Sequence, residues 1–307
     1  MTLPPPLPPN ARQPAPNQTP KNFGLIGFPL GHSLSPVIHS AALRAAGLAG
    51  AYRLYPVAPL PEGEADLLGL LAQLRAGELD GLNVTIPHKS VAARVEERTP
   101  EVQALGAANT LIRLPGGRLR AANTDAPAFL ADLVAQAPEL GGWPGAALVL
   151  GAGGSARAVV FRLALAGWQV WVAARRPEQA QAFVAGLQAV LPGAGLYPLA
   201  LEKDAFRRAL PSGLALIVNA TPAGMAPWED LSPWPPGAPF PAAAFVYDLI
   251  YNPAETILLR AARAAGLAGC NGLGMLVEQA ALSFALWTGF DPPRAALYRA
   301  LAGHTGG

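Results

Sequence analysis

Short apolar runs alternate with amphipathic segments along most of the chain. Residues 23–28, 52–57 and 81–86 are apolar runs of strand length, whereas residues 36–46 and 62–75 carry apolar side chains at helical spacing. Regular alternation of strands and helices is typical of a parallel sheet covered by helices. The first part of the chain is therefore expected to form an α/β domain with a mainly parallel sheet.

A β-hairpin and a connecting helix are expected next. Residues 110–114 and 118–121 are joined by the Pro-Gly-Gly segment 115–117, which favours a tight turn. Residues 125–136 then show helical spacing and lead into the second half of the chain.

A second series of strands and helices begins near residue 146. Its segments span 147–150, 155–166, 169–174, 177–190, 214–219 and 244–250. Such a series predicts a Rossmann-type, doubly wound sheet. Two terminal helices, 275–287 and 292–301, are too few for a further domain, so we expect them to return to the first domain.

Composition narrows the class of protein. Of the 307 residues, 51% are hydrophobic and 14% are charged. No uncharged apolar run reaches the roughly 18 residues of a membrane-spanning helix, so we expect a soluble protein without a membrane partner. Lys and Arg number 22 against 20 Asp and Glu, with no concentrated basic segment. This balance argues against a nucleic-acid partner.

Cysteine and histidine usage argues against disulfides and metals. Cys270 is the one cysteine, and the four histidines are scattered singly, without zinc-ligand spacing. We therefore expect a cytoplasmic protein that uses no metal. The proline-rich start, residues 1–21, lacks the basic-then-apolar layout of a signal peptide and is predicted to be a disordered tail.

A glycine-rich loop follows the apolar strand at 147–150. The loop consists of Gly151, Ala152, Gly153, Gly154, Ser155 and Ala156. This GxGxxA pattern between a strand and a helix is the context of a dinucleotide-binding loop. Gly151 permits a tight turn, Gly153 lets the backbone approach a pyrophosphate, and Ala156 allows close packing of helix on strand. The alternative is a turn without a ligand.

Two arginines follow the next strand, 169–174. Arg175 and Arg176 stand where NAD-binding chains carry an acidic side chain that accepts from the ribose hydroxyls. A guanidinium suits the additional 2′-phosphate of NADP instead. NADP is therefore expected rather than NAD, unless both arginines are simply solvated.

Two serines follow the first predicted strand. Ser33 and Ser35 are spaced so that their hydroxyls could converge on one carboxylate. Ligands of open parallel sheets lie at the carboxyl ends of the strands, which is where this loop stands. Ser35 is equally expected as the N-cap of the following helix.

A lysine and several short polar side chains indicate a site at the same sheet edge. The third strand delivers Asn83, Thr85 and Lys89 to this edge, and a lysine just beyond a buried strand indicates a function. Asn109 and Asp125 flank the hairpin, whose two ends could bring them together. Structural turns explain these Asn and Asp residues equally well.

Eight longer motifs extend over most of the chain. From about residue 22 to residue 289 they are GLIGFPLGHSLSP, GLNVTIPHK, GAANT, NTD, GAGGSARA, NATPAGM, YDLIYNPAET and NGLGMLVEQAA. In order and spacing they resemble the shikimate dehydrogenase family. The resemblance implies an NADPH-dependent, reversible reduction of 3-dehydroshikimate to shikimate, a step of aromatic amino acid biosynthesis.

The resemblance also implies roles for individual residues. Lys89 and Asp125 match the family's catalytic pair, in which the lysine donates to the carbonyl oxygen as charge develops and the aspartate holds the ammonium. The alternative is that Lys89 and Asp125 form an ordinary surface ion pair without a catalytic role. The implied substrate contacts are Ser33, Ser35, Thr85, Asn109, Tyr251 and Gln279. The implied NADP contacts are Gly151, Ala152, Gly153, Gly154, Ser155, Ala156, Arg175, Arg176, Thr221, Met225 and Gly274.

Three positions depart from the family pattern. Pro222, Ala126 and Ala174 stand where a serine, a glycine and an asparagine are usual. The change at Ala174 could remove one contact to the adenosine phosphate, and the other two affect backbone contacts near the cofactor and the domain hinge.

Two alternative functions remain. One is a quinate/shikimate dehydrogenase that uses NAD, against which the arginines at 175 and 176 and the serines at 33 and 35 weigh. The other is a non-catalytic sensor of the same fold that binds shikimate, against which the retained Lys89 and Asp125 weigh.

The expected organisation has two domains and a tail. Residues 22–125 together with 273–307 are predicted to form the substrate-binding catalytic domain, and residues 126–272 the NADP-binding Rossmann domain. The expected assembly is a monomer or a homodimer. A cleft between two such domains is expected to close over both ligands.

Overall fold

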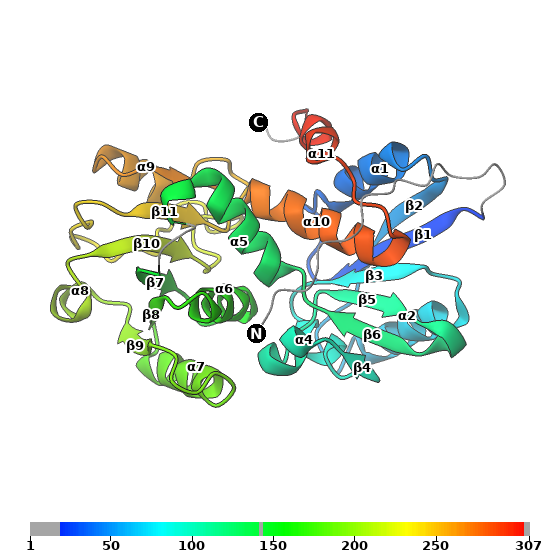
Figure 1. The fold of residues 1–307 in the computed structure, drawn as a ribbon, viewed down its shortest axis with the longest axis horizontal. Helices are drawn as coiled ribbons and strands as arrows, with labels where there is room; N and C mark the ends of the chain where they lie inside the picture. The colour runs from blue at the N-terminus through cyan, green and yellow to red at the C-terminus, as the bar shows by residue number, and fades with distance from the viewer. Residues whose placement is uncertain (1–18, 141–143, 304–307) are drawn as a thin grey trace.

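The computed structural model describes residues 19–140 and 144–303. They form two α/β units, each built on a six-stranded sheet with helices on both faces (Figure 1). Helix α5 (Asp125–Gln136) leads into the second unit, and helix α10 (Leu273–Thr288) returns to the first. These two helices pack against each other, so the chain enters and leaves the second unit at one place.

The first sheet has the strand order β2-β1-β3-β5-β6-β4. Its strands are β1 (Lys21–Gly27), β2 (Gly50–Pro56), β3 (Gly81–Val84), β4 (Glu97–Arg98), β5 (Thr110–Arg113) and β6 (Leu119–Ala122). Three of the five pairings are parallel, and β5 runs antiparallel to both β3 and β6. The start of β5 and the end of β6 therefore lie at the edge where β1 and β3 end.

Helices cover both faces of the first sheet. They are α1 (Ser35–Ala45), α2 (Glu64–Ala76), α3 (Lys89–Ala92), α4 (Pro100–Leu105), α10 and α11 (Arg294–Leu301), with a 3₁₀ turn at Pro115–Gly117. Phe23 of β1 belongs to one buried cluster with Ile38 of α1 and Phe284 of α10. Ile26, three residues later, belongs to the cluster on the opposite face with Leu74 of α2. The strand thus buries apolar side chains on both faces, as parallel strands do.

The second sheet is parallel throughout, in the order β12-β11-β10-β7-β8-β9. Its strands are β7 (Ala146–Leu150), β8 (Gln169–Ala174), β9 (Leu196–Ala200), β10 (Leu214–Asn219), β11 (Phe245–Asp248) and β12 (Gly269–Cys270). The strand order reverses between β7 and β10. In open α/β sheets ligands bind at such a reversal, outside the carboxyl ends of the strands.

Helices also sandwich the second sheet. They are α6 (Gly154–Leu165), α7 (Pro177–Gln188), α8 (Lys203–Ala209) and α9 (Ile257–Ala264), with a 3₁₀ turn at Pro138–Leu140. Along β7, Val149 joins the cluster of Val159 in α6, whereas Leu148 joins that of Leu258 in α9. Neighbouring side chains of β7 thus point to opposite faces of the sheet, one covered by α6 and the other by α9.

The predicted fold class is confirmed, with a mainly parallel first sheet and a doubly wound second sheet. The two terminal helices return to the first unit as expected, where both contact α1. The strand predicted at 81–86 was wrong in its last two residues, because the chain turns after Val84 and the His88 amide donates to the Thr85 carbonyl. β9 was not predicted. Pro198 interrupts its pattern, and a proline is tolerated because β9 lies at the sheet edge.

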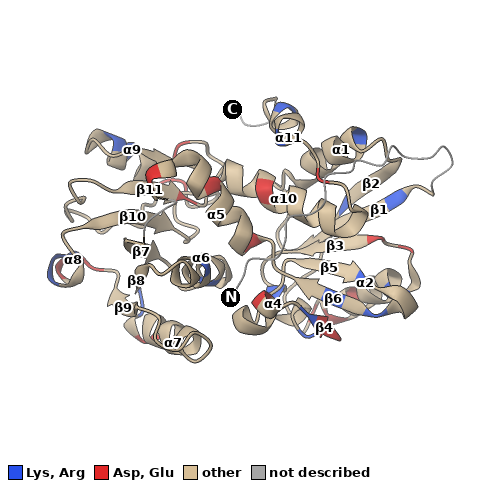
Figure 2. Cartoon of the chain, viewed as in Figure 1, with Lys and Arg blue, Asp and Glu red and all other residues tan. Residues whose placement is uncertain are grey.

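Acidic and basic residues are interspersed over both units (Figure 2). No helix among residues 19–140 and 144–303 is long and apolar enough to cross a membrane. The tail predicted at residues 1–21 lies mostly outside the described residues, and β1 begins at the last residue assigned to it, Lys21.

Candidate active site

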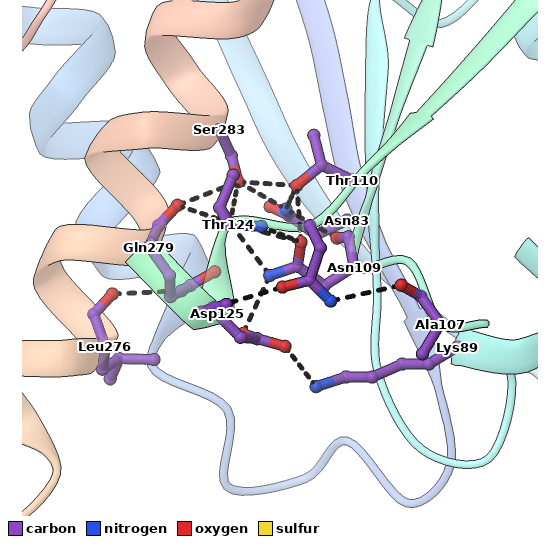
Figure 3. A network of polar contacts seen from close by, with 12 residues as sticks. Asn83, Lys89, Ala107, Asn109, Thr110, Thr124, Asp125, Leu276, Gln279 and Ser283 are labelled. Atoms are coloured by element: carbon purple, nitrogen blue, oxygen red, sulfur yellow. Dashed lines mark hydrogen bonds and ion pairs between the residues drawn. The ribbon is translucent and has the colours of Figure 1, made fainter. Parts of the chain in front are cut away.

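Lys89 and Asp125 meet at the carboxyl edge of the first sheet. Lys89 is the first residue of α3, just beyond β3, and Asp125 is the first residue of α5, just beyond β6. Lys89 Nζ lies 2.8 Å from Asp125 Oδ2, and the two side chains are 18% and 10% exposed (Figure 3). An ion pair this sheltered from water is screened less than a surface pair. The proximity on which the predicted catalytic pair depends is therefore present.

Asn109 fixes the other oxygen of the same carboxylate. Its Nδ2 donates to Asp125 Oδ1 at 2.8 Å and to Thr124 Oγ1 at 2.9 Å. Its Oδ1 accepts from the Thr124 backbone amide at 2.8 Å. The hairpin therefore brings Asn109 and Asp125 together, as the sequence suggested, and the contacts orient Asp125 toward Lys89.

A buried polar network behind Asn109 was not predicted. Asn83 Nδ2 has three acceptors for its two hydrogens: the Asn109 carbonyl at 3.0 Å, Thr110 Oγ1 at 3.2 Å and Ser283 Oγ at 2.9 Å. Asn83 is 4% exposed, so it lies next to Asn109 and Thr110 with its amide satisfied by buried partners. Thr124 and Ser283 both donate to the Gln279 backbone carbonyl, at 3.2 and 2.9 Å.

This network ties helix α10 to the site. Gln279 and Ser283 lie on successive turns of α10, and Figure 3 shows both turned toward Thr124 and Asp125. The Gln279 side-chain amide donates to the Leu276 carbonyl at 3.0 Å. The motifs containing Asn109-Thr110 and Asn123-Thr124 were visible in the sequence, but Ser283 is a lone serine in an apolar helix and gives no such signal.

The predicted carboxylate-binding residues stand beside one another. Ser35 begins α1 and is buried, and its backbone amide donates to Ser33 Oγ at 3.3 Å. The N-cap is Leu34, so the alternative that Ser35 caps the helix was wrong. Burial raises the pKa of Tyr251, and a hydrogen bond with the Leu34 backbone opposes that rise. Tyr251, from the second unit, thus lies at the turn that carries both serines.

Thr85 completes the same edge. It directly follows β3, and its backbone amide donates to the Ile26 carbonyl of β1 at 2.8 Å. Its methyl group packs so closely on Gly27 that a Cβ there would meet it at 2.3 Å. The threonine is held between the ends of two neighbouring strands, on the edge that also carries Lys89.

The glycine-rich loop lies at the strand-order reversal of the second sheet. Gly151 has φ +109°, and a Cβ on it would lie 3.0 Å from the Ala220 carbonyl oxygen beyond β10. Gly153 and Gly154 are exposed, and a Cβ on either would meet no atom within 4 Å. Ala156, in the first turn of α6, is fully buried. An open backbone at a helix N-terminus between β7 and β10 fits a dinucleotide pyrophosphate.

Four other predicted cofactor residues follow the strands on either side of β7. Arg175 and Arg176 are exposed at the end of β8, where Arg176 donates to Gln179 Oε1 at 3.3 Å. Beyond β10, Thr221 Oγ1 donates to Asn219 Oδ1 at 2.7 Å, which anchors the turn opposite Gly151. Met225, in the same loop, is 42% exposed.

Gly274, which was also predicted to contact the cofactor, packs between two helices. It lies in the first turn of α10, and a Cβ on it would lie 1.9 Å from Asp132 Oδ1 of α5. The structure therefore gives Gly274 a packing role between α5 and α10, and its contact with a cofactor stays a prediction.

Two family models match the chain. The shikimate dehydrogenase substrate binding domain matches residues 25–111, and the shikimate 5′-dehydrogenase C-terminal domain matches residues 272–302. A curated relative, the NADP⁺-dependent shikimate dehydrogenase of Salinibacter ruber, is 44% identical over 90% of this chain and 95% of its own length.

Solved structures resemble more than nine-tenths of the chain. Shikimate 5-dehydrogenase from Thermus thermophilus, in complex with NADP(H) and shikimate, is 40% identical, with a TM-score of 0.75 over 91% of this chain and 98% of that one. Quinate dehydrogenase from Corynebacterium glutamicum, in complex with NAD, is 29% identical, with a TM-score of 0.81 over 92% and 99%. Sequence and structure together place this chain in the shikimate dehydrogenase family.

Proposed function

We propose that this chain catalyses the reversible, NADPH-dependent reduction of 3-dehydroshikimate to shikimate. The observation that carries the proposal is the Lys89–Asp125 pair, 2.8 Å apart and sheltered at the carboxyl edge of the first sheet. Its NADP⁺-dependent relatives and the shikimate-bound structure support the same reaction.

Lys89 is the proton donor in this proposal. Bound NADPH supplies the hydride, and NADP⁺ accepts it in reverse. As the keto oxygen of the substrate gains negative charge, an ammonium beside it stabilises that charge and donates a proton. Asp125 holds the lysine ammonium in position through the ion pair. Asn109 holds Asp125 in turn.

The remaining polar residues would orient the substrate. Ser33 and Ser35 share one turn, which Tyr251 contacts, and these three residues suit the carboxylate. Thr85, Asn109 and Gln279 belong to the surroundings of the catalytic pair and suit the ring hydroxyls. The Asn109 amide is already bonded to Asp125 and Thr124. The hydrogen bonds of Asn109 therefore support a role in orienting the Asp125 carboxylate at least as strongly as a role in binding the substrate.

The second unit would hold NADP. We propose that residues 126–272 bind the cofactor and that residues 22–125 with 273–307 bind the substrate. The open amides at Gly153 and Gly154 suit the pyrophosphate, and Arg175 with Arg176 suits the 2′-phosphate. The two matched family segments, 25–111 and 272–302, support this division because both belong to the first unit.

Four rates test this function. NADP⁺ or NAD⁺ is supplied with shikimate or quinate, and reduced cofactor is followed by absorbance. We expect the shikimate–NADP⁺ pair to be fastest by a wide margin. Faster turnover of quinate with NAD⁺ would establish the quinate/shikimate alternative, and tight shikimate binding without turnover would establish the sensor.

A further inference from the structure

One buried carboxylate joins the two segments at the carboxyl ends of β10 and β11. We call residues 219–225 the β10 loop and residues 248–251 the β11 turn. The β10 loop carries Thr221, which was predicted to contact NADP, and the β11 turn carries Tyr251, which was predicted to contact the substrate. Asp248 is hydrogen-bonded to both segments, so a single side chain holds the two together.

Asn219 gives the β10 loop its shape. Its Oδ1 accepts from the Thr221 backbone amide at 2.9 Å and from the Thr221 hydroxyl at 2.7 Å. Its Nδ2 donates to the Ala223 carbonyl at 3.3 Å and to Asp248 Oδ1 at 2.9 Å. These two bonds use both hydrogens of the amide, and the backbone partners at its two ends leave it one orientation.

The β10 loop lies against the glycine-rich loop. The Ala220 amide donates to the Leu150 carbonyl of β7 at 2.9 Å. A Cβ on Gly151 would lie 3.1 Å from Thr221 Cγ2. Thr221 thus stands beside the turn where the pyrophosphate is proposed to bind. A shift of the β10 loop would therefore change the shape of the proposed NADP site.

Asp248 holds the β11 turn with the same oxygen. Its Oδ1 accepts from the Ile250 amide at 3.0 Å. The Ile250 carbonyl accepts from the Gly272 amide at 3.1 Å, so the backbone is fixed on both sides of Ile250, directly before Tyr251. Gly272 is the N-cap of α10, which ties the turn to the helix that carries Gln279.

The other oxygen of Asp248 binds the start of α9. Asp248 Oδ2 accepts from Thr256 Oγ1 at 2.6 Å, and Thr256 caps α9 by accepting from the Leu259 amide at 3.3 Å. A Cβ on Gly224 would lie 3.2 Å from Thr256, so the β10 loop packs on this cap. Asn219 and Asp248 are both 0% exposed. Neither can touch a ligand, so each acts only through the residues that it holds.

We propose that Asp248 and Asn219 are positioning residues. Asp248 Oδ1 holds the β11 turn directly and the β10 loop through Asn219. The inference rests on the proposed function, in which Thr221 contacts the cofactor and Tyr251 the substrate carboxylate. A segment that is not held in place must be ordered by the ligand itself, which lowers affinity. Loss of the Asn219 amide therefore weakens binding of NADP⁺ alone, whereas loss of the Asp248 carboxylate weakens binding of both ligands.

Ligand binding measured without turnover tests this division. Isothermal titration calorimetry gives Kd for NADP⁺ and, in a separate titration, Kd for shikimate. We expect Asn219→Ala to raise Kd for NADP⁺ about fivefold, the order of one lost buried hydrogen bond, with Kd for shikimate within about twofold of the wild type. Asp248→Ala should raise both Kd values about fivefold or more.

A conservative variant separates position from charge. Asp248→Asn keeps an acceptor oxygen for Asn219 and Ile250, because the flipped amide would face their two hydrogen-bond donors. Both Kd values should therefore stay near those of the wild type. Binding as weak in Asp248→Asn as in Asp248→Ala would overturn the assignment to the two Oδ1 bonds.

Trp234→Phe is the matched control for general damage. Trp234 lies in the connection between β10 and β11, and its indole donates to the Ala238 carbonyl at 3.0 Å away from Asp248. Loss of this buried bond should lower the melting temperature and leave both Kd values unchanged. Equal rises of Kd in Trp234→Phe and Asp248→Ala would show that destabilisation alone weakens binding, and would overturn the inference.

The remaining outcomes separate the inference from the function on which it rests. Unchanged Kd values in Asn219→Ala and Asp248→Ala overturn the positioning roles. If Asp248→Ala fails to fold, Asp248→Ser takes its place, since a serine is too short to bond both donors. A wild-type chain that binds neither ligand overturns the inference and the proposed function together. A wild-type chain that binds both ligands without oxidising shikimate overturns the function alone, and the Kd comparison still decides the inference.

Discussion

Lys89 Nζ lies 2.8 Å from Oδ2 of Asp125, and Oδ1 of the same carboxylate accepts from Asn109 Nδ2 at 2.8 Å. Both carboxylate oxygens are therefore engaged by the chain's own donors, which fixes the plane of the carboxylate. The ammonium carries three hydrogens, and the bond to Asp125 uses one of them. Lys89 is thus held in place with donors left for a substrate oxygen.

Lys89→Ala should remove turnover without removing substrate binding. We expect kcat to fall about 10²-fold or more with little change in KM, because the lysine acts mainly as charge develops in the transition state. Steady-state NADPH assays at several shikimate concentrations measure both constants.

Lys21→Ala is the matched control for that variant. Lys21 also pairs with an aspartate, Asp80, at 2.7 Å, but it lies at the start of β1 and is 37% exposed. Loss of such a pair costs about 0–1 kcal/mol of stability and should leave kcat unchanged. Comparable kcat in the Lys21 and Lys89 variants would reject the catalytic role of Lys89.

Arg175→Ala should weaken the preference for NADPH over NADH. Arg175 is exposed at the end of β8, and among the described residues it makes no hydrogen bond or ion pair that would occupy its guanidinium. Loss of a charge-assisted bond to the 2′-phosphate corresponds to about a tenfold or greater rise in KM for NADPH. KM for NADH should not change, since NADH lacks that phosphate.

Arg53→Ala controls for the removal of a surface charge. Arg53 is exposed on β2 of the first unit, where it donates to Asn22 Oδ1 at 3.1 Å. Its removal should leave both Michaelis constants unchanged. An unaltered NADPH/NADH ratio in Arg175→Ala would transfer the selector role to Arg176 or to another contact.

Local patterns predicted the elements and motifs that depend on neighbours in sequence. The glycine loop was placed within a residue of its observed position because a strand, a turn and a helix N-terminus each leave a local signal. The meeting of Asn109 and Asp125 was also foreseeable, since a hairpin must bring its own ends together.

Contacts between segments that are far apart in the sequence leave no local pattern by which they could be predicted. Ser283 bonds Thr110 and Asn83, which lie 173 and 200 residues away in sequence. Nothing around Ser283 distinguishes it from an incidental serine in an apolar helix until α10 is known to return to the first unit. The short elements α8 and β12 were missed because their lengths span too few residues to show a period.

Asp248 should make stability depend on pH. Burial raises the pKa of its carboxyl from 3.8 to about 6, and bonds from Thr256, Ile250 and Asn219 oppose the rise. Between about pH 4 and 6 the folded chain therefore binds more protons than the unfolded chain. The contribution of Asp248 to the free energy of unfolding falls as pH rises through this window and is constant above it.

Asp248→Asn should remove that dependence. The interval between the two pKa values corresponds to about 3 kcal/mol. The wild type should therefore lose up to about that much unfolding free energy relative to the variant between pH 4 and 7. Urea unfolding at each pH measures the difference. A difference that is the same at every pH would show that Asp248 titrates alike in both states.

Gly274→Ala should destabilise the junction of the two units. A Cβ at Gly274 would lie 1.9 Å from Oδ1 and 2.5 Å from Oδ2 of Asp132, a buried carboxylate that also accepts from Tyr247. Neither group can move freely, so α10 and α5 must separate. We expect a loss of about 1–3 kcal/mol in unfolding free energy, the usual cost of overpacking.

Gly69→Ala is the same substitution in an open part of a helix. Gly69 lies in α2, where a Cβ would meet no atom within 4 Å. Alanine there should stabilise the chain by about 0.5–1 kcal/mol, because glycine loses more backbone entropy on folding. Thermal unfolding should thus shift in opposite directions for the two variants. A Gly274→Ala protein as stable as the wild type would mean that α5 and α10 can separate at no cost, which the buried Asp132–Tyr247 bond between α5 and β11 argues against.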